Sequence, residues 1–443
     1  MPLTGLDIYK LLPKTNCGDC GSPTCLAFAM RMAQKKAELE ECPHVSEEAK
    51  ATLAGASAPP MRLVKIGAGD HEIEIGNETI MFRHESTFLH QCAVAIQIDP
   101  TDETPPAEQA KQIDGLLFER VGQQIGVNLV AIPDDSGDPA KYAEAVKTAT
   151  DACALTPMLM TADPECMAAA LKVCADRKPL LASATADNAE AMAALAKENG
   201  CALVVAADGL EALAALTEKV KAAGCEDMIL DPGARDTGAV IQRLTEHRRY
   251  ALKKNFRPLG YPSIAYAAAD DPAEQLLQAS AYIAKYAGVV VARLREPWQV
   301  LPLLTMRQNI YTDPQKPIQV EPKLYEIGNV TDESPLLVTT NFSLTYFTVE
   351  GDVEASRVPS YILVVDTEGT SVLTAYAAEK FTAEGIAQAL QNVGDRIKHR
   401  KVIIPGHVSV MSGKLEDESG WEVLVGPRES SGIPSYLKTV WKP

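Results

Sequence analysis

The chain has 443 residues, which is longer than one typical domain of roughly 100–200 residues, and we expect three domains. An apolar fraction of 46% and a charged fraction of 23% are those of an ordinary globular protein and exclude a disordered chain. Lys and Arg number 42 against 59 Asp and Glu, so the formal charge of -17 argues against nucleic acid and anionic membranes as partners.

The sequence shows no recognisable targeting or membrane-spanning segment. The opening residues, Met1 to Lys14, lack the apolar core of a signal peptide. No later stretch approaches the roughly 20 apolar residues that a membrane helix needs. We therefore expect a cytoplasmic protein.

A cluster of four cysteines marks the beginning of the chain. Three of them follow the spacing Cys-x2-Cys-x4-Cys, and the fourth comes after sixteen further residues, directly before Pro43. Four thiolates at this spacing can surround one compact inorganic body, which favours a 4Fe-4S cluster. The expected ligands are Cys17, Cys20, Cys25 and Cys42.

Glycines inside this motif fit the same chemistry. Gly18 and Gly21 let backbone amides approach the sulfurs without side-chain obstruction, which stabilises added negative charge. The stretch from Leu26 to Glu41 is predicted to be a helix that leads from the third ligand to the fourth. Zinc is the alternative, because four cysteines also close a tetrahedral site. Structural zinc sites usually show two Cys-x2-Cys pairs, however, and the second pair is missing here.

The remaining cysteines share no spacing, and we interpret them as buried thiols. They are Cys92, Cys153, Cys166, Cys174, Cys201 and Cys225.

Two linker-like stretches divide the chain, the Ala-Pro-rich residues Ala54 to Pro60 and the Pro-rich residues Tyr311 to Pro322. They predict a 4Fe-4S domain over 1–58, a central domain over 59–312 and a third domain over 313–443. The central domain should open with a short antiparallel lead-in over 61–83. Its expected strands are Met61 to Ile66, Glu72 to Ile75 and Thr79 to Phe82.

From about Ala93 to Tyr311, short apolar runs alternate with Ala-rich stretches long enough for helices. Eight such repeats in about 220 residues predict a closed (β/α)8 TIM barrel rather than an open sheet. The expected strands are Val94–Ile98, Asn128–Ile132, Met158–Met160, Leu180–Ala182, Ala202–Ala206, Met228–Leu230, Pro262–Ala265 and Val289–Ala292. Asp-Pro or Pro-Asp pairs follow several of them and should end a strand and start a helix.

The third domain again mixes strands and helices and is predicted to be a smaller doubly wound, Rossmann-like α/β domain. Its clearest strands are Leu336–Thr339, Tyr361–Val365, Lys401–Ile404 and Glu422–Val425. Ligands of open α/β sheets bind at the carboxyl ends of the strands, so we expect a ligand crevice there.

The cysteine motif and the order of the domains carry a family resemblance. The residues from Thr15 to Cys25 read TNCGDCGSPTC, and an eight-repeat barrel and a small α/β domain follow. Over its whole length the chain resembles the large (gamma) subunit of the corrinoid iron-sulfur protein of the reductive acetyl-CoA (Wood-Ljungdahl) pathway. The motif alone occurs in other cluster proteins of anaerobes, whereas the three-part order is specific.

The resemblance implies a corrinoid methyl carrier, which acts as methyl acceptor and donor in a methyltransferase system. Co(I) of a cobamide would accept a methyl group from methyltetrahydrofolate through a methyltransferase. Methyl-Co(III) would donate it to the nickel site of acetyl-CoA synthase, and the 4Fe-4S cluster would reduce cobalt that has slipped to Co(II). The implied partners are a smaller barrel subunit in a heterodimer, the methyltransferase, CO dehydrogenase/acetyl-CoA synthase and a low-potential electron donor.

By the same resemblance, the cobamide would lie against strand ends of the third domain. Hydroxyls and backbone amides there can bond its amide arms and its nucleotide phosphate, and an arginine can add charge. The implied contacts are Thr340, Tyr346, Gly369, Thr370, Ser371, Val372, Leu373, Thr374, Gly426, Pro427 and Arg428. The alternative is that Gly369 to Ser371 only caps the next helix. His407 is a further lining candidate, although a histidine with no metal role is the simpler interpretation.

No histidine lies in the Asp-x-His-x-x-Gly pattern by which some proteins replace the cobamide's own base. We therefore expect a base-off corrinoid without a protein histidine ligand, which is easier to reduce to Co(I) because no axial donor must leave.

Two other functions stay open at this point. The barrel itself could bind a pterin and transfer the methyl group, with Asp99 and Asp231 at strand ends, although both also fit turn chemistry before proline. Alternatively, the chain could be an electron-transfer or scaffold subunit without cobamide. Bound folate would favour the first, and cluster absorption without corrin bands would favour the second.

Overall fold

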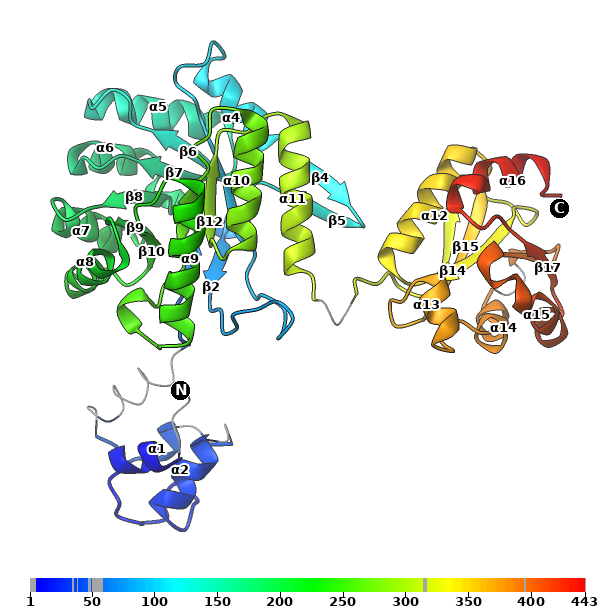
Figure 1. Cartoon of the computed structure of the whole chain (residues 1–443), viewed down its shortest axis with the longest axis horizontal. Coiled ribbons are helices and arrows are strands. Elements are labelled where there is room, and N and C mark those ends of the chain that lie inside the picture. The colour runs from blue at the N-terminus through cyan, green and yellow to red at the C-terminus, as the bar shows by residue number, and fades with distance from the viewer. Residues whose placement is uncertain are drawn as a thin grey trace. The chain divides into compact units, whose positions relative to one another are not determined.

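The structure is a computed structural model that describes residues 5–33, 36–37, 39–46, 49, 59–313, 317–393 and 396–442 (Figure 1). The chain forms two compact units. One comprises residues 1–117 and 126–311, and the other comprises residues 118–125 and 312–443. Among the described residues, no helix has both the length and the apolar character that a membrane span requires.

The N-terminal region contains two short helices, α1 (Gly5–Leu11) and α2 (Cys25–Ala33), and a 3-10 turn, η1 (Leu39–Glu41). The expected helix from Leu26 to Glu41 is wrong in extent, because α2 ends at Ala33 and η1 is a separate turn. Most of the expected linker from Ala54 to Pro60 lies outside the described residues. The region packs around a small apolar cluster centred on Phe28.

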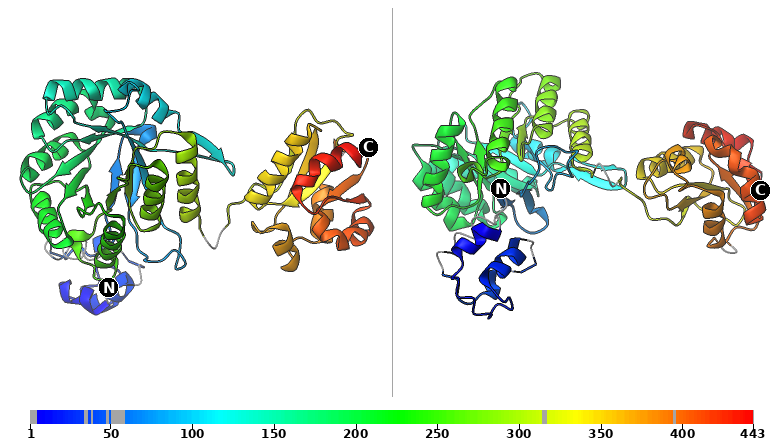
Figure 2. Two further views of the ribbon diagram at one scale, coloured as in Figure 1. Left: turned by 45° about the horizontal axis from the view of Figure 1, so that its top comes forward. Right: turned by 60° about the horizontal axis from the view of Figure 1, so that its bottom comes forward.

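After this region, the first unit holds an eight-stranded parallel sheet, and the prediction of a (β/α)8 barrel is confirmed (Figure 2). The strands are β3 (Ala93–Gln97), β6 (Leu129–Pro133), β7 (Thr156–Met160), β8 (Leu180–Ala184), β9 (Leu203–Ala206), β10 (Met228–Asp231), β11 (Ile264–Tyr266) and β12 (Val289–Ala292). They pair in the order β10-β9-β8-β7-β6-β3-β12-β11, and a parallel bridge between Leu230 and Ser263 joins the two ends. All eight predicted strands are present to within two or three residues at each end.

Helices follow the strands and surround the sheet. They are α4 (Pro106–Asp114), α5 (Pro139–Ala152), α6 (Pro164–Cys174), α7 (Ala189–Asn199), α8 (Leu210–Ala222), α9 (Thr237–Leu252), α10 (Pro272–Ala284) and α11 (Pro297–Tyr311). Aspartates start several of them as predicted: the carboxylate of Asp163 accepts from the Glu165 amide, and that of Asp271 accepts from the Glu274 amide. Short 3-10 turns η2 (Gly69–His71), η3 (Ala175–Arg177) and η4 (Arg257–Leu259) complete the unit.

An antiparallel pair, β1 (Leu63–Ile66) and β2 (Ile73–Gly76), precedes the barrel. Val64, Ile66 and Ile75 join the apolar cluster of the barrel interior, so this lead-in closes part of the core. The third expected strand, Thr79 to Phe82, is wrong, because these residues form neither a strand nor a helix. Side-chain contacts hold this stretch instead.

The Arg248 side chain fixes that stretch. Its guanidinium donates to the Glu78 carboxylate at 3.0 Å and to the Ile80 carbonyl at 2.6 Å, and it lies over the rings of Phe88 and Tyr286. Arg248 and Glu78 are both nearly fully buried. A buried charge is tolerated only when it is paired in this way, so the ion pair specifies the path of residues 77–90.

The second unit is built on a five-stranded mixed sheet of order β13-β15-β14-β16-β17. The predicted strands are confirmed as β14 (Leu336–Thr340), β15 (Ser360–Val365), β16 (Lys401–Ile404) and β17 (Glu422–Val425), which are parallel. The antiparallel edge strand β13 (Leu324–Ile327) was not anticipated, because it is short and follows the Pro-rich stretch. The hairpin β4 (Leu117–Arg120) and β5 (Gln123–Gly126) was also missed.

Helices cover both faces of this sheet (Figure 1). One face carries α12 (Ser343–Ser356) and α16 (Ile433–Thr439), and the other carries α13 (Val372–Ala377), α14 (Ala383–Gln391) and α15 (Ser412–Ser419). Two 3-10 turns, η6 (Gly406–Met411) and η7 (Ser430–Gly432), follow β16 and β17. Parallel strands with helices on both faces confirm the α/β class of this unit.

Replacing Arg248 tests the buried ion pair. Arg248→Met should lower the free energy of unfolding of the barrel by about 3–5 kcal/mol, because the Glu78 carboxylate is left buried without its partner. The neighbouring Arg249 is exposed, so Arg249→Met should change the free energy of unfolding by less than about 0.5 kcal/mol. Urea unfolding followed by circular dichroism measures both. Equal stabilities of the two variants would contradict this role of Arg248.

Candidate functional site

Three of the four cysteines of the N-terminal motif share one core. Cys25 is the first residue of α2, Cys42 follows η1, and both are buried in the apolar cluster around Phe28. Cys20 is partly buried against the same cluster. The fold of this small region therefore gathers three thiols that lie up to 22 positions apart in the sequence.

The backbone of the motif is open on one side. Gly18 and Gly21 have φ of +84° and +70°, and a Cβ on either would meet no atom within 4 Å. The Gly21 amide donates to the Gly18 carbonyl at 2.9 Å, which closes a tight turn between Cys17 and Cys20. Glycine adopts a left-handed conformation without strain, and it has no Cβ. The backbone at these two positions can therefore approach a bulky group in the open space.

Asn16 orients the third thiol. Its Oδ1 accepts from the Cys25 amide at 2.8 Å, and its own amide lies 3.4 Å from the Cys25 Sγ. An N–H directed at sulfur stabilises the thiolate over the thiol. This role of Asn16 was not anticipated, because nothing in the spacing of the motif specifies which side chain caps the loop.

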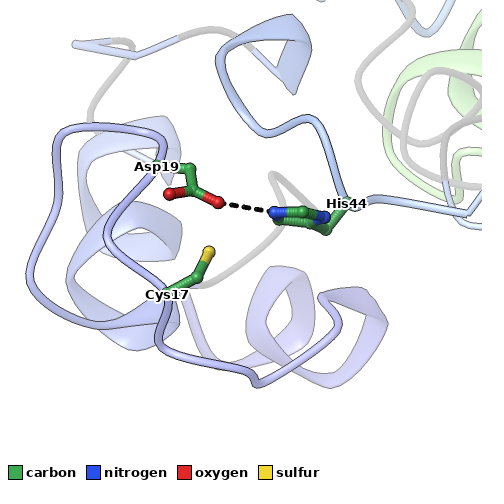
Figure 3. A group of neighbouring side chains, drawn as sticks. All are labelled: Cys17, Asp19 and His44. Atoms are coloured by element: carbon green, nitrogen blue, oxygen red, sulfur yellow. Dashed lines mark hydrogen bonds and ion pairs between the residues drawn. The ribbon is translucent and has the colours of Figure 1, made fainter.

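Cys17 is exposed and lies beside Asp19 and His44 (Figure 3). The ligand-type atoms of these three side chains are within 4.8 Å of one another, and within the described part of the chain they are the only such group of His, Cys, Asp or Glu. His44 Nε2 lies 2.6 Å from Asp19 Oδ2, and this hydrogen bond holds the pKa of Asp19 below its usual range. Cys17 thus lies in a polar setting, outside the apolar cluster that holds Cys25 and Cys42.

The donor set fits an iron-sulfur cluster. Cys20, Cys25 and Cys42 share one apolar cluster, and Cys17 is exposed. The turn leaves room beside two left-handed glycines, and an amide already points at the Cys25 sulfur. Fe-S clusters are held by cysteine thiolates and stabilised by hydrogen bonds to sulfur. The region's own chemistry therefore agrees with the expectation from the spacing.

The second candidate site is the carboxyl edge of the mixed sheet. Strands β14 to β17 all end there, and the expected contact residues Thr340, Gly369 to Thr374, and Gly426 to Arg428 follow three of those ends. Parallel pairing therefore brings together segments that are separated by about 90 residues of sequence.

Three hydroxyls at the end of β14 are buried without a hydrogen-bond partner among the described residues. They belong to Thr339, Thr340 and Ser343. A buried hydroxyl without a partner costs about 1–3 kcal/mol, so a well-packed domain rarely keeps three of them in five residues. Thr339 and Thr340 are consecutive residues of β14 and face opposite sides of the sheet, so each hydroxyl is a separate candidate contact. Thr340 was an expected contact, whereas Thr339 and Ser343 were not.

Asn341 organises the loop after β15, a role that the sequence reading missed. Its Oδ1 accepts from the amides of Thr367 and Gly369 and from the Thr367 hydroxyl, each at 3.0 Å. Its Nδ2 donates to the carboxylate of Asp366 at 2.9 Å. The side chain is buried, so one amide holds the loop from one strand end to the next.

The loop continues into α13. Gly369 has φ of +71°, which fits a turn that only glycine adopts without strain. Ser371 occupies the cap position of α13 but makes no capping hydrogen bond, and its hydroxyl instead lies 3.1 Å from that of Thr374. Capping therefore does not account for these hydroxyls. Leu373 is half exposed, and Val372 is partly buried.

The ends of β16 and β17 pass very close to each other. The Gly406 amide donates to the Pro427 carbonyl at 3.0 Å, and a Cβ on Gly406 would lie 2.6 Å from the Gly426 carbonyl oxygen. This contact sets the direction in which the turn leaves the sheet. Arg428 is exposed at its tip and forms no ion pair with the described residues. His407 lies 3.7 Å from Glu429 at the same edge.

Tyr346 differs from the other expected contacts. It is buried in the first turn of α12, between the rings of Tyr325 and Phe347, and its hydroxyl donates to Glu350 at 2.8 Å. Burial raises the pKa of Tyr346. The side chain is thus a neutral part of the core under α12, and its hydroxyl is already engaged.

The two aspartates considered for a barrel site are occupied by local contacts. Asp99 accepts from the amide and the hydroxyl of Thr101, which is turn chemistry. Asp231 is buried and accepts from both terminal nitrogens of Arg235, at 3.1 and 2.7 Å. Asp231 is thus paired through both oxygens, whereas the contacts of Asp99 use Oδ1.

Comparison with known proteins places these features in a family. The family model described as CO dehydrogenase/acetyl-CoA synthase delta subunit matches residues 63–437, and one described as a putative Fe-S cluster matches residues 12–44. The corrinoid/iron-sulfur protein large subunit of Moorella thermoacetica is 52% identical over 441 residues, 99% of each chain. The acetyl-CoA decarbonylase/synthase complex subunit gamma of Methanothermobacter thermautotrophicus is 37% identical, again over 99% of each chain.

Among solved structures, the 7,8-dihydropteroate synthase of Vibrio fischeri is similar over 49% of this chain and 93% of its own. Its sequence identity is 15% and its TM-score is 0.37, too low to carry an argument.

Replacing Asn341 tests how the carboxyl edge is held. In Asn341→Ala, the amides of Thr367 and Gly369 lose their acceptor, so their hydrogen exchange should accelerate about tenfold or more. Asn392 is exposed at the end of α14, and Asn392→Ala should leave the same amides unchanged. Hydrogen-deuterium exchange of the peptide that covers residues 366–371 measures both. Unchanged protection in Asn341→Ala would contradict the assignment.

Proposed function

This chain belongs to the family of corrinoid/iron-sulfur protein large subunits, which includes the gamma subunits of acetyl-CoA decarbonylase/synthase complexes, and we propose which of its residues serve that function. It is a corrinoid protein of the methyl-transfer system and works as a methyl carrier in acetyl-CoA synthesis. We propose three working parts: an iron-sulfur domain over 1–58, a barrel over 59–312 and a corrinoid domain over 313–443. The observation that carries the proposal is the set of three unpartnered buried hydroxyls beside a preorganised loop, on the same chain as the four-thiol motif.

The proposed cluster ligands are Cys17, Cys20, Cys25 and Cys42. A 4Fe-4S cluster bound there supplies low-potential electrons. The chain's own part is to hold the four sulfurs, to direct the Asn16 amide at one of them and to keep Gly18 and Gly21 free of side chains. Burial of Cys25 and Cys42 excludes water from half of the site.

Metal analysis tests the ligand set. Anaerobically purified chain should contain about four irons and show the broad visible absorption of a 4Fe-4S cluster. Cys42→Ala should lose most of both, because three thiolates hold the cluster less completely than four. The matched control is Cys174→Ala, since burial raises the pKa of the Cys174 thiol to about 12 and keeps it protonated. Zinc in place of iron in the unaltered chain would overturn the proposal.

The corrinoid is proposed to bind at the carboxyl edge of the mixed sheet. Bound there, it supplies the cobalt that accepts and donates the methyl group. Thr339, Thr340 and Ser343 offer their unpartnered hydroxyls, and Ser371 with Thr374 offers two more. The Gly369 to Ser371 loop is held in place by Asn341, so these donors are preorganised.

The turn from Gly426 to Arg428 completes the proposed contacts. The close approach of Gly406 to this turn fixes its backbone, and the exposed Arg428 guanidinium has no described ion-pair partner. Arginine binds phosphate in a bidentate manner, so Arg428 suits the nucleotide phosphate of a cobamide. Tyr346 is proposed to contact the corrinoid through its apolar ring and not as a hydrogen-bond donor, because its hydroxyl is bonded to Glu350.

We further propose that no histidine of this chain binds the cobalt. The mixed sheet has two nearby histidines. His399 precedes β16 at the opposite edge, and both of its ring nitrogens are engaged, with the Ser334 carbonyl and the Lys401 amide. His407 is at the carboxyl edge but lies against Glu429. A cobalt without a strong axial nitrogen donor is easier to reduce.

The spectrum of the corrinoid-loaded chain tests this assignment. His407→Ala should retain the cobalt content and the corrin absorption bands of the unaltered chain, because neither depends on an imidazole ligand. His399→Ala is the control at the opposite edge of the sheet. A shift of the corrin bands in His407→Ala alone would show that His407 is a ligand.

We propose that the chain acts within a multisubunit assembly. Its proposed partners are a smaller barrel subunit, a methyltetrahydrofolate methyltransferase, CO dehydrogenase/acetyl-CoA synthase and a low-potential electron donor. Membership of a complex is supported by relatives that are named as subunits of the acetyl-CoA decarbonylase/synthase complex. Exposed apolar side chains around the carboxyl edge, Leu373, Tyr376 and Val410, suit a surface that a partner covers.

A pterin-binding barrel is the less supported alternative. The two aspartates named for it have local partners: Asp231 is paired with Arg235, and Asp99 Oδ1 accepts from Thr101. A cluster protein without cobamide leaves the buried hydroxyls of the C-terminal unit without a role. Cobalt and corrin bands in purified chain decide between the carrier and both alternatives.

A further inference from the structure

The carboxyl-terminal mouth of the barrel has a polar side. Residues at alternate positions of each strand face the barrel interior, and these are aliphatic through most of the barrel. On four neighbouring strands, β10, β11, β12 and β3, the same alternation ends in a polar residue. These residues are Asp231, Tyr266, Arg293 and Gln97.

The corresponding positions of three other strands are apolar. Continuing the inward alternation along β6, β7 and β9 leads to Pro133, Met160 and Ala206. Polar residues are therefore not found at the inward strand-end position of every strand. They form an arc over adjacent strands, at the end of the barrel where such folds bind ligands.

Arg235 completes the arc and is fixed in place. Its two terminal nitrogens bond the Asp231 carboxylate, one of them also donates to the Ala234 carbonyl, and its guanidinium lies 4.6 Å from the centre of the Tyr266 ring. A guanidinium has five N–H donors, so Nε and one N–H of Nη2 stay without a described partner. Because the group is held on three sides, those donors are preorganised.

A cavity of about 250 Å³ lies against the arc. Gln97, Arg235, Tyr266 and Arg293 line it together with small apolar residues. The Gln97 amide and the Tyr266 hydroxyl have no hydrogen bond with the described residues. Burial raises the pKa of Tyr266, so its hydroxyl stays a neutral donor.

We propose that this cavity binds a compact oxyanion, a carboxylate or phosphate group, between Arg235, Arg293 and Gln97. The charges support an anion: Asp231 neutralises Arg235, while Arg293 bonds only the fully exposed Asp270 carboxylate and the Ala269 carbonyl. An exposed ion pair is weak, so the lining keeps a net positive charge.

A purely structural role explains less of the arc. Arg235 could serve only to compensate the buried Asp231 carboxylate. That interpretation leaves the inward Gln97 amide, the Tyr266 hydroxyl and Arg293 without a reason to converge on one cavity. The site is within the barrel and is independent of the proposed cluster and corrinoid sites.

Anion titration of the full-length chain tests the proposal. Inorganic phosphate and acetate are the probes, titrated by calorimetry at constant ionic strength. At least one should bind saturably with one site per chain, and the stronger probe identifies the phosphate or the carboxylate class. Arg293→Gln should weaken binding about tenfold or more, and Gln97→Leu about three- to tenfold without changing the charge.

Arg249→Gln is the control, because it removes one exposed positive charge from the same barrel outside the cavity. Its binding constant should equal that of the unaltered chain. The proposal is overturned if neither probe binds saturably, if Gln97→Leu binds as tightly as the unaltered chain, or if Arg249→Gln weakens binding as much as Arg293→Gln does. Unchanged thermal unfolding of the variants shows that any loss is not one of folding.

Discussion

Parallel strand pairing is the constraint on which both units of this protein depend. When strands run in the same direction, every carboxyl end lies at one edge, and residues far apart in sequence meet there. In the mixed sheet this edge gathers Thr340, the Gly369 loop and the Gly426 turn. In the barrel it gathers Gln97, Asp231, Tyr266 and Arg293. The interior packing fixes the strands, and chemistry is free to vary only at their ends.

The two edges treat their polar groups differently, and the difference bears on function. In the barrel, the buried Asp231 carboxylate is paired with Arg235, so the chain itself compensates that buried charge. In the mixed sheet, three buried hydroxyls have no described partner, while Asn341 nearby accepts from the amides of Thr367 and Gly369 in the adjoining loop. The Asn341 amide has its partners within the chain, whereas the three hydroxyls do not. A ligand that bonds these hydroxyls would therefore stabilise the folded state.

The sequence predicted what local patterns specify. Eight apolar runs with helical stretches between them identified every barrel strand, and the cysteine spacing identified the motif around Cys25. It did not reveal Asn341, Arg235 or the Arg248–Glu78 pair, because each depends on a partner that only the tertiary fold brings near. Thr79 to Phe82 has the composition of a strand, yet contacts with α9 hold it as a loop.

The N-terminal region shows how binding and folding combine in a small domain. A domain of about 60 residues buries a smaller fraction of its surface than a larger domain does and is marginally stable. Here the apolar cluster contains two of the proposed ligands, Cys25 and Cys42, as fully packed members, with Cys20 at its border. The same thiols are thus packed in the apolar core and are proposed as ligands. An inorganic group bound to them would therefore also pack against the core. We therefore expect cluster binding at the proposed ligands to be coupled to the folding of this region.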